Sequence, residues 1–172
     1  MAAFTVVWLG QIVSVLATGM AAFAQSIWVF QETGSATALG LVHVFFIVPF
    51  LALSPVAGVM VDRYNRKLMM MLSDLVAILP TVGLLLLSAA GRLEVWHFYV
   101  AAAFQGIGNT FQWPAYSAAI TMMVPKQQLG RANGMMSLIE AGPGVVAPLL
   151  AGALLPVIGL TGILGLDVAT FV

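Results

Sequence analysis

The chain has 172 residues, of which 62% are hydrophobic and 7% are charged, and its mean hydropathy is +1.07. A soluble domain cannot bury so much apolar surface, so we expect lipid to be the solvent of most of the chain. Six basic residues balance six acidic residues, so the charge does not indicate nucleic-acid binding. No cysteine is present, which excludes disulfides and thiol chemistry.

Apolar segments long enough to span a membrane follow one another along the chain. A spanning helix needs about 20 mainly apolar residues to cross a hydrocarbon core of roughly 30 Å. Segments of this length lie at about residues 4–30, 36–60, 68–90, 95–123 and 132–157. A sixth begins near Leu160 and is too short to cross by Val172, so we expect it to be truncated. The first segment is too long for a cleavable signal peptide and lacks a basic stretch before it.

The connections between the segments are short, and Gly34, Gly91 and Pro125 supply the breaks, so we expect one bundle over residues 1–172. Basic residues near membrane ends are retained on the cytoplasmic side. The second-to-third and fourth-to-fifth connections hold Arg63, Arg66, Lys67, Lys126 and Arg131. The other two connections hold Glu32 and Glu94 but only one basic residue, Arg92, so the sequence predicts a cytoplasmic N-terminus.

An internal repeat is visible when the sequence is shifted by 94 residues. The shift aligns Gln11 with Gln105, Gly40 with Gly134, Pro49 with Pro143, Ala57 with Ala151, and Gly58 with Gly152. Because each copy would contain three helices, the second copy would cross the membrane in the opposite orientation to the first. This is the inverted 3+3 repeat of some secondary transporters. The alternative is chance, because small residues are common in membrane helices.

Polar residues within two of the segments fall on single helical faces. Spacings of three, four and seven in one segment, and of four, three and four in the other, bring each set onto one face. The two sets are Gln11, Ser14, Thr18 and Gln25, and Gln105, Asn109, Gln112 and Tyr116. Because the repeat aligns the two segments, we interpret both faces as walls of a shared substrate cavity. Hydrogen bonding between helices is the alternative.

The connection between the second and third segments resembles motif A of the major facilitator superfamily. Its residues are Gly58, Asp62, Arg63, Asn65, Arg66 and Lys67. Asn65 stands where the second glycine of that motif is usual, and we expect it to keep a left-handed backbone. Gly58 would permit close helix approach, and Asp62 would accept hydrogen bonds from basic neighbours or from a helix N-terminus of the other half. The resemblance implies a conformational latch, and a plain positive-inside anchor is the alternative.

Two further stretches bear on the same resemblance. Gly142-Pro143-Gly144 is similar to a loose antiporter motif and predicts a kink in the fifth helix. Gln105-Gly106 is similar to the core of motif B, but Ala102 stands where that motif has an arginine associated with proton transfer. The resemblance therefore gives no support for proton coupling in this half of the transporter.

Together with residues 29–35, 114–119, 124–125 and 129–134, these motifs resemble the enterobactin exporter and macrolide efflux branch of the superfamily. The resemblance implies the N-terminal half of a twelve-helix antiporter in the bacterial inner membrane, which exports a drug or siderophore-like molecule by alternating access. Its partners would be membrane lipid, a small-molecule substrate and the missing C-terminal half, with no nucleic acid, cofactor, metal or enzymatic activity. A lysophospholipid or lipid flippase and a structural membrane subunit without transport are the alternatives.

Three acidic residues lie within the predicted spans. Glu140 is about nine residues into its segment, or roughly 13 Å deep, where a charge needs a partner, water or a proton. The functional hypothesis is that Glu140 carries a coupling proton or binds a cationic group of the substrate. The alternative is that it is a neutral acid hydrogen-bonded to a neighbouring helix. We interpret the shallower Asp74 and Asp167 as structural. His43 and His97 stand alone, without a second ligand at metal spacing.

Overall fold

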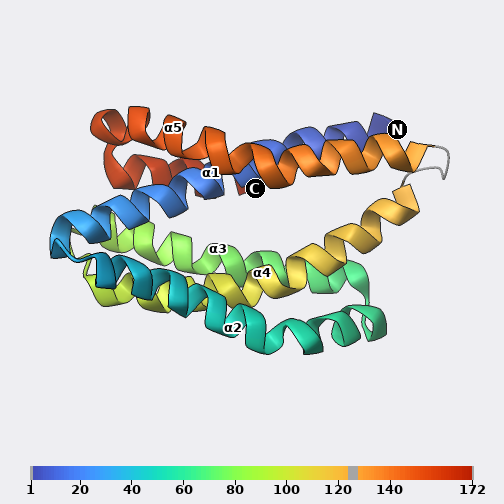
Figure 1. The fold of residues 1–172 in the computed structure, drawn as a ribbon, viewed down its shortest axis with the longest axis horizontal. Helices are drawn as coiled ribbons and strands as arrows, with labels where there is room; N and C mark the ends of the chain where they lie inside the picture. Colours follow the sequence, from blue (N-terminus) through green and yellow to red (C-terminus); the bar gives the residue numbers. More distant parts are fainter. Residues whose placement is uncertain (1, 124–127, 172) are drawn as a thin grey trace. The chain divides into compact units, whose positions relative to one another are not determined.

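The computed structural model describes residues 2–123 and 128–171, with side chains except at 2–4, 6–7, 61–62, 66–67, 70, 113–123, 129 and 131. The described chain forms helices joined by short connections (Figure 1). They are α1 (Ala2–Thr33), α2 (Ala36–Arg63), α3 (Arg66–Ala89), α4 (Val95–Met123) and α5 (Leu129–Phe171). The all-α class predicted from the sequence is confirmed.

Four stretches of the described residues are long and apolar enough to cross a membrane. They are Trp8–Thr33 in α1, Ala36–Met60 in α2, Met71–Ala89 in α3 and Ala132–Phe171 in α5. The predicted span in α4 is not among them, because the described part of α4 carries Gln105, Asn109 and Gln112. Much of the apolar surface of α2 is exposed, including Val48 and Leu51, as expected of a helix solvated by lipid.

Two residues connect α1 and α2: Gly34 ends α1, and Ser35 begins α2. Gly34 has a positive φ of 60°, and its backbone N–H donates to the carbonyl oxygen of Phe30 at 2.8 Å, which closes the last turn of α1. The side chain of Ser35 then accepts the N–H of Ala38 at 3.3 Å and caps α2. One helix therefore ends and the next begins within two residues.

Helix α5 consists of two arms that meet at Gly159, whose φ of 66° and ψ of −179° are not helical. We call residues 129–158 the proximal arm and residues 160–171 the distal arm. Figure 1 shows the chain reversing direction in this region of α5. At Gly142-Pro143-Gly144, where the sequence predicts a kink, the backbone keeps helical dihedrals, and the non-helical break of α5 lies at Gly159.

The chain divides into two compact units, which are described separately. Unit 1 comprises residues 1–25 and 120–172, and unit 2 comprises residues 26–119. In unit 1, α1 and the proximal arm approach closely at Gly19, where a Cβ would lie 2.9 Å from the Cβ of Ala147. Small residues at such a contact let helix backbones pack tightly in a membrane, where there is no hydrophobic force between helices.

Unit 2 is held together by glycine contacts and by aromatic pairs. A Cβ on Gly106 of α4 would overlap the backbone carbonyl of Phe46 in α2, and one on Gly108 would lie 2.9 Å from the carbonyl oxygen of Ser73 in α3. Trp28 stacks on the buried ring of Phe98 with ring centroids 4.9 Å apart. Helix α4 is therefore packed closely against both α2 and α3.

Candidate functional site

The polar face of α4 is largely engaged with α3. Gln105 donates from Nε2 to Oγ1 of Thr81 at 3.2 Å, and Gln112 donates from Nε2 to Oδ1 of Asp74 at 3.0 Å. Asn109 lies between them in the sequence and is exposed. The side chain of Tyr116, the fourth residue of this predicted cavity face, lies outside the described residues. For Gln105 and Gln112 the structure therefore favours the alternative of hydrogen bonding between helices.

Thr110 adds a polar contact that sequence reasoning missed. Its buried side-chain Oγ1 donates to the carbonyl oxygen of Gly106 at 2.8 Å and also lies 3.4 Å from the carbonyl oxygen of Phe50 in α2. A threonine commonly bonds back to its own helix, so the sequence offers no signal for the contact with α2.

Removing one partner of the Gln105–Thr81 bond is expected to destabilise the chain. Gln105→Leu and Thr81→Val should each lower the free energy of unfolding by about 0.5–1.5 kcal/mol, because hydrogen bonds between membrane helices contribute amounts of this order. The double variant should lose less than the sum, since only one bond is removed. Unfolding in mixed detergent micelles measures all three, and strictly additive losses would contradict the pairing.

In unit 1 the polar face of α1 includes one contact with the distal arm of α5. Thr18 donates from Oγ1 to Oδ1 of Asp167 at 2.7 Å. Thr18 is exposed, whereas Asp167 is only 2% exposed. Gln11 and Ser14 of the same predicted face are half-buried. Sequence reasoning missed this pairing, because 149 residues separate its two partners.

Gln25 ends the predicted α1 face and is buried, with 4% of its surface exposed. Within the described part of the chain its side chain makes no hydrogen bond. Buried polar side chains are normally hydrogen-bonded to protein or water, so an unbonded amide in this position needs a partner from elsewhere.

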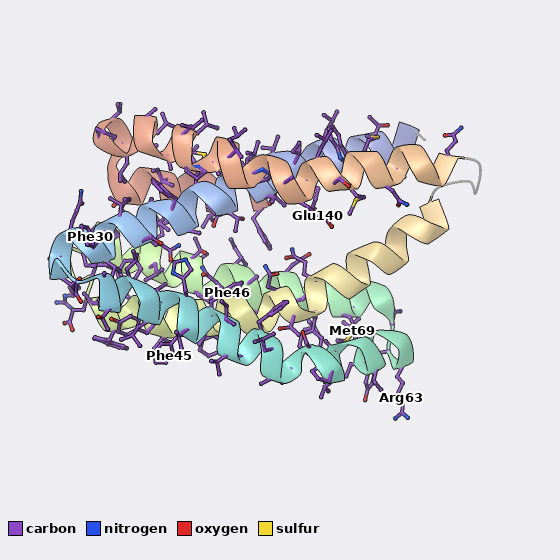
Figure 2. All side chains as sticks on the ribbon, in the orientation of Figure 1. Phe30, Phe45, Phe46, Arg63, Met69 and Glu140 are labelled. Carbon is purple, nitrogen blue, oxygen red and sulfur yellow. The ribbon has the colours of Figure 1, made fainter. Side chains whose placement is uncertain are left out.

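The structure describes only part of the motif A residues. Gly58 and Arg63 are exposed, and Figure 2 shows the Arg63 side chain extending away from the end of α2. The side chains of Asp62, Arg66 and Lys67 lie outside the described residues.

Two expectations for motif A are corrected. Asn65 does not have the predicted left-handed backbone, because no described residue other than glycine has a positive φ. Its carbonyl oxygen instead accepts the N–H of Met69 at 3.0 Å, which places it at the N-cap position of α3, a position that asparagine favours. Gly58 makes no close approach within the described chain, since a Cβ there would meet no atom within 4 Å.

The connection between α2 and α3 is anchored by apolar contacts that sequence reasoning missed. Met69 of α3 is buried, and Met60 of α2 and Phe111 of α4 pack against it. Methionine fills irregular gaps because its side chain is flexible and polarizable. The charged turn of motif A is thus joined to a small apolar cluster shared by three helices.

Glu140 lies in the proximal arm of α5 with its side chain exposed (Figure 2). His43 donates from Nδ1 to the carbonyl oxygen of Leu39 in its own helix at 3.2 Å, and Nδ1 of His97 accepts the backbone N–H of Glu94 at 2.9 Å. Across the residues that were searched, no three His, Asp or Glu side chains gather as a metal site.

Helices α3 and α4 line an open apolar cavity of about 410 Å³ in unit 2. Its walls come from α3 and α4 and include Leu79, Pro80, Leu84, Trp96, His97 and Phe104. Apart from His97, these side chains are apolar or aromatic, so the cavity suits a hydrocarbon chain better than a polar molecule.

Comparisons with known proteins agree on one family. The sequence model of the Major Facilitator Superfamily matches residues 7–172. Macrolide efflux protein A of Streptococcus pyogenes is 29% identical over 165 residues, which cover 96% of this chain and 41% of that protein. Macrolide efflux protein A of Enterococcus faecalis is 30% identical over 135 residues, covering 78% of this chain and 42% of that protein.

The enterobactin exporter EntS of Citrobacter koseri is 27% identical over 172 residues, which cover 99% of this chain and 41% of that protein. The chain therefore spans about two fifths of the length of these curated relatives. No solved structure matches the chain significantly.

Proposed function

The chain belongs to the major facilitator superfamily, and from this premise we propose that it is the N-terminal part of a transporter that exports a small organic molecule. One observation carries the proposal: relatives that align with nearly the whole chain include a macrolide efflux protein and an enterobactin exporter. Superfamily members are transporters rather than enzymes, so we propose an antiporter that works by alternating access in the bacterial inner membrane.

The proposed architecture is a six-helix half with an inverted 3+3 repeat and a cytoplasmic N-terminus. The turn at Gly159 supports it, because the distal arm then counts as a sixth helix. Ala57 and Ala151, which the repeat aligns, are also equally buried, since both are 0% exposed. The C-terminal half of the transporter and membrane lipid would be the partners of this part.

The proposed substrate cavity draws mainly on α1. Gln11 and Ser14 are half-buried without a bond to another helix among the described residues, and Gln25 is buried without a hydrogen bond there. Asn109 contributes from α4, whereas Gln105 and Gln112 serve the cavity by fixing α4 against α3. Tyr116 completes the proposed set. Glu140 is a candidate for a cationic group of the substrate or for a proton.

Motif A is proposed to act as a latch between the two halves. Arg63 is exposed at the end of α2 and is free of an ion pair among the described side chains, so it is available to an acidic or helix C-terminal group of the other half. Asp62, Arg66 and Lys67 would complete the cluster with Gly58 and Asn65. These charged contacts between the two halves would stabilise one end state of the alternating-access cycle.

Efflux from cells tests the proposal. Cells that express the full-length gene containing this sequence should export at least one member of a panel of macrolides, siderophores and dyes. Asp62→Asn should lower that efflux at least tenfold, because the amide keeps the size of the carboxylate but loses its charge. Glu32→Gln, which changes an exposed acid at the end of α1, is the matched control and should keep efflux near the parent level.

Other outcomes of the same assay separate the alternatives. The apolar cavity of about 410 Å³ favours a lipid flippase as the second candidate, so the panel includes a fluorescent lysophospholipid. Translocation of that lipid without drug or siderophore efflux would support the flippase and contradict the export of a small organic molecule. A well-expressed protein that moves nothing would support a structural subunit.

A further inference from the structure

Unit 1 contains a buried carboxylic acid next to an exposed hydroxyl. Asp167 is 2% exposed and accepts a hydrogen bond of 2.7 Å from the hydroxyl of Thr18, which is itself exposed. Asp167 lies eight residues beyond Gly159, or about 12 Å along the distal arm at 1.5 Å per residue. The buried acid is thus one hydrogen bond away from an exposed hydroxyl on the polar face of α1.

A hydroxyl suits both protonation states of an acid. It donates to a carboxylate, as Thr18 does here, and it can equally accept the O–H of the protonated acid. Threonine in a helix can then turn its own hydroxyl proton to a backbone carbonyl of the preceding turn. The pair therefore keeps its hydrogen bond whether or not Asp167 holds a proton, which a reversible proton site requires.

The other acids within the spans lack this arrangement. Asp74 accepts from the amide of Gln112, which in the observed orientation can only donate. Glu140 is exposed and makes no hydrogen bond within the described part of the chain. Among these three acids, Asp167 alone combines burial with a partner that serves both protonation states.

The titratable groups of the surrounding elements are few. Residues 2–25 of α1 contain none, and Asp167 is the sole titratable residue of the distal arm. The proximal arm carries Arg131, whose side chain lies outside the description, and the exposed Glu140. Gln11 and Ser14 lie seven and four residues before Thr18, so they continue a polar face of α1 that can hold water leading to the pair.

We propose that Asp167, supported by Thr18, binds and releases the proton that is exchanged for substrate, an inference that rests on the proposed export function. On uptake, the carboxylate gains one proton from water and its O–H bonds to Oγ1 of Thr18. On release, the proton returns to water on the other side of the membrane and Thr18 again donates to the carboxylate.

The full-length transporter in proteoliposomes, with a radiolabelled macrolide and a pH-sensitive dye, tests this site. Asp167→Asn should lower macrolide-driven proton movement at least tenfold, while macrolide counterflow, which needs no net proton movement, should fall less than threefold. Thr18→Val should shift the pH of half-maximal transport by at least half a unit, whereas Thr18→Ser should restore the parent profile. Thr170→Val, which removes only bonds to backbone carbonyls of its own arm, is the matched control and should change neither quantity.

Each result decides one of the two claims. Parent-like proton movement in Asp167→Asn, or an unchanged pH profile in Thr18→Val, would overturn the proton site while leaving export intact. Loss of proton movement in Glu140→Gln but not in Asp167→Asn would assign the proton to Glu140 and overturn it as well. If Asp167→Asn does not fold, the Thr18 variants still decide. A parent protein without macrolide, siderophore or dye transport would overturn both claims.

Discussion

Replacing Gly159 with alanine is expected to destabilise the fold by about 2–3 kcal/mol, because its backbone occupies a region that is essentially restricted to glycine. With a φ of 66° and a ψ of −179°, a Cβ at this position would strain the turn between the two arms of α5. Relief of that strain would move the distal arm and with it the bond from Thr18 to Asp167. The midpoint of unfolding in mixed detergent micelles measures the loss.

Gly165→Ala is the matched control for this prediction. Gly165 lies in the distal arm, has no positive φ, and a Cβ there would meet no atom within 4 Å. Alanine favours a helix over glycine by roughly 0.5–1 kcal/mol, so this variant should be neutral or more stable than the parent. Equal stability of Gly159→Ala and Gly165→Ala would contradict the turn at Gly159.

Replacing Gly106 with alanine is expected to cost about 2–3 kcal/mol by overpacking the contact between α2 and α4. The added methyl group would overlap the backbone carbonyl of Phe46, and a backbone atom cannot move aside as a flexible side chain can. The two helices would have to separate, which would also break the 3.4 Å contact from Thr110 to the carbonyl oxygen of Phe50. Thermal unfolding in detergent measures the effect.

Gly83→Ala in α3 provides the comparison, because a Cβ at Gly83 would meet no atom within 4 Å. This variant should keep or raise the unfolding temperature. A Gly106→Ala protein as stable as Gly83→Ala would show that α2 and α4 do not pack at this glycine.

Properties that depend on local sequence could be predicted. Composition and the length of the apolar runs predict membrane helices, and Gly34 predicts the break between the first two of them, where α1 ends. The break at Gly159 falls between the segments predicted to end at 157 and to begin near Leu160. Each of these features is decided by residues within a few positions of one another.

Properties that depend on neighbours distant in the sequence could not be predicted. The face of α4 is visible as a pattern, but its partners Thr81 and Asp74 on α3 are known only once the helices are packed. Pro143 predicts a kink because proline removes a backbone bond, but its packing near the small residue Gly19 of α1 is visible only in the structure. Asn65 was ambiguous because asparagine suits both a left-handed turn and an N-cap.

Transport by purified protein tests the central claim most directly. The full-length protein containing this sequence would be reconstituted in proteoliposomes, and transport of a radiolabelled macrolide, a siderophore and a fluorescent lysophospholipid would be followed with and without an imposed proton gradient. We predict substrate accumulation that requires the gradient and that collapses in Asp62→Asn but not in Glu32→Gln. Correctly folded protein that moves neither substrate under any gradient, or moves only the lysophospholipid, would contradict the account.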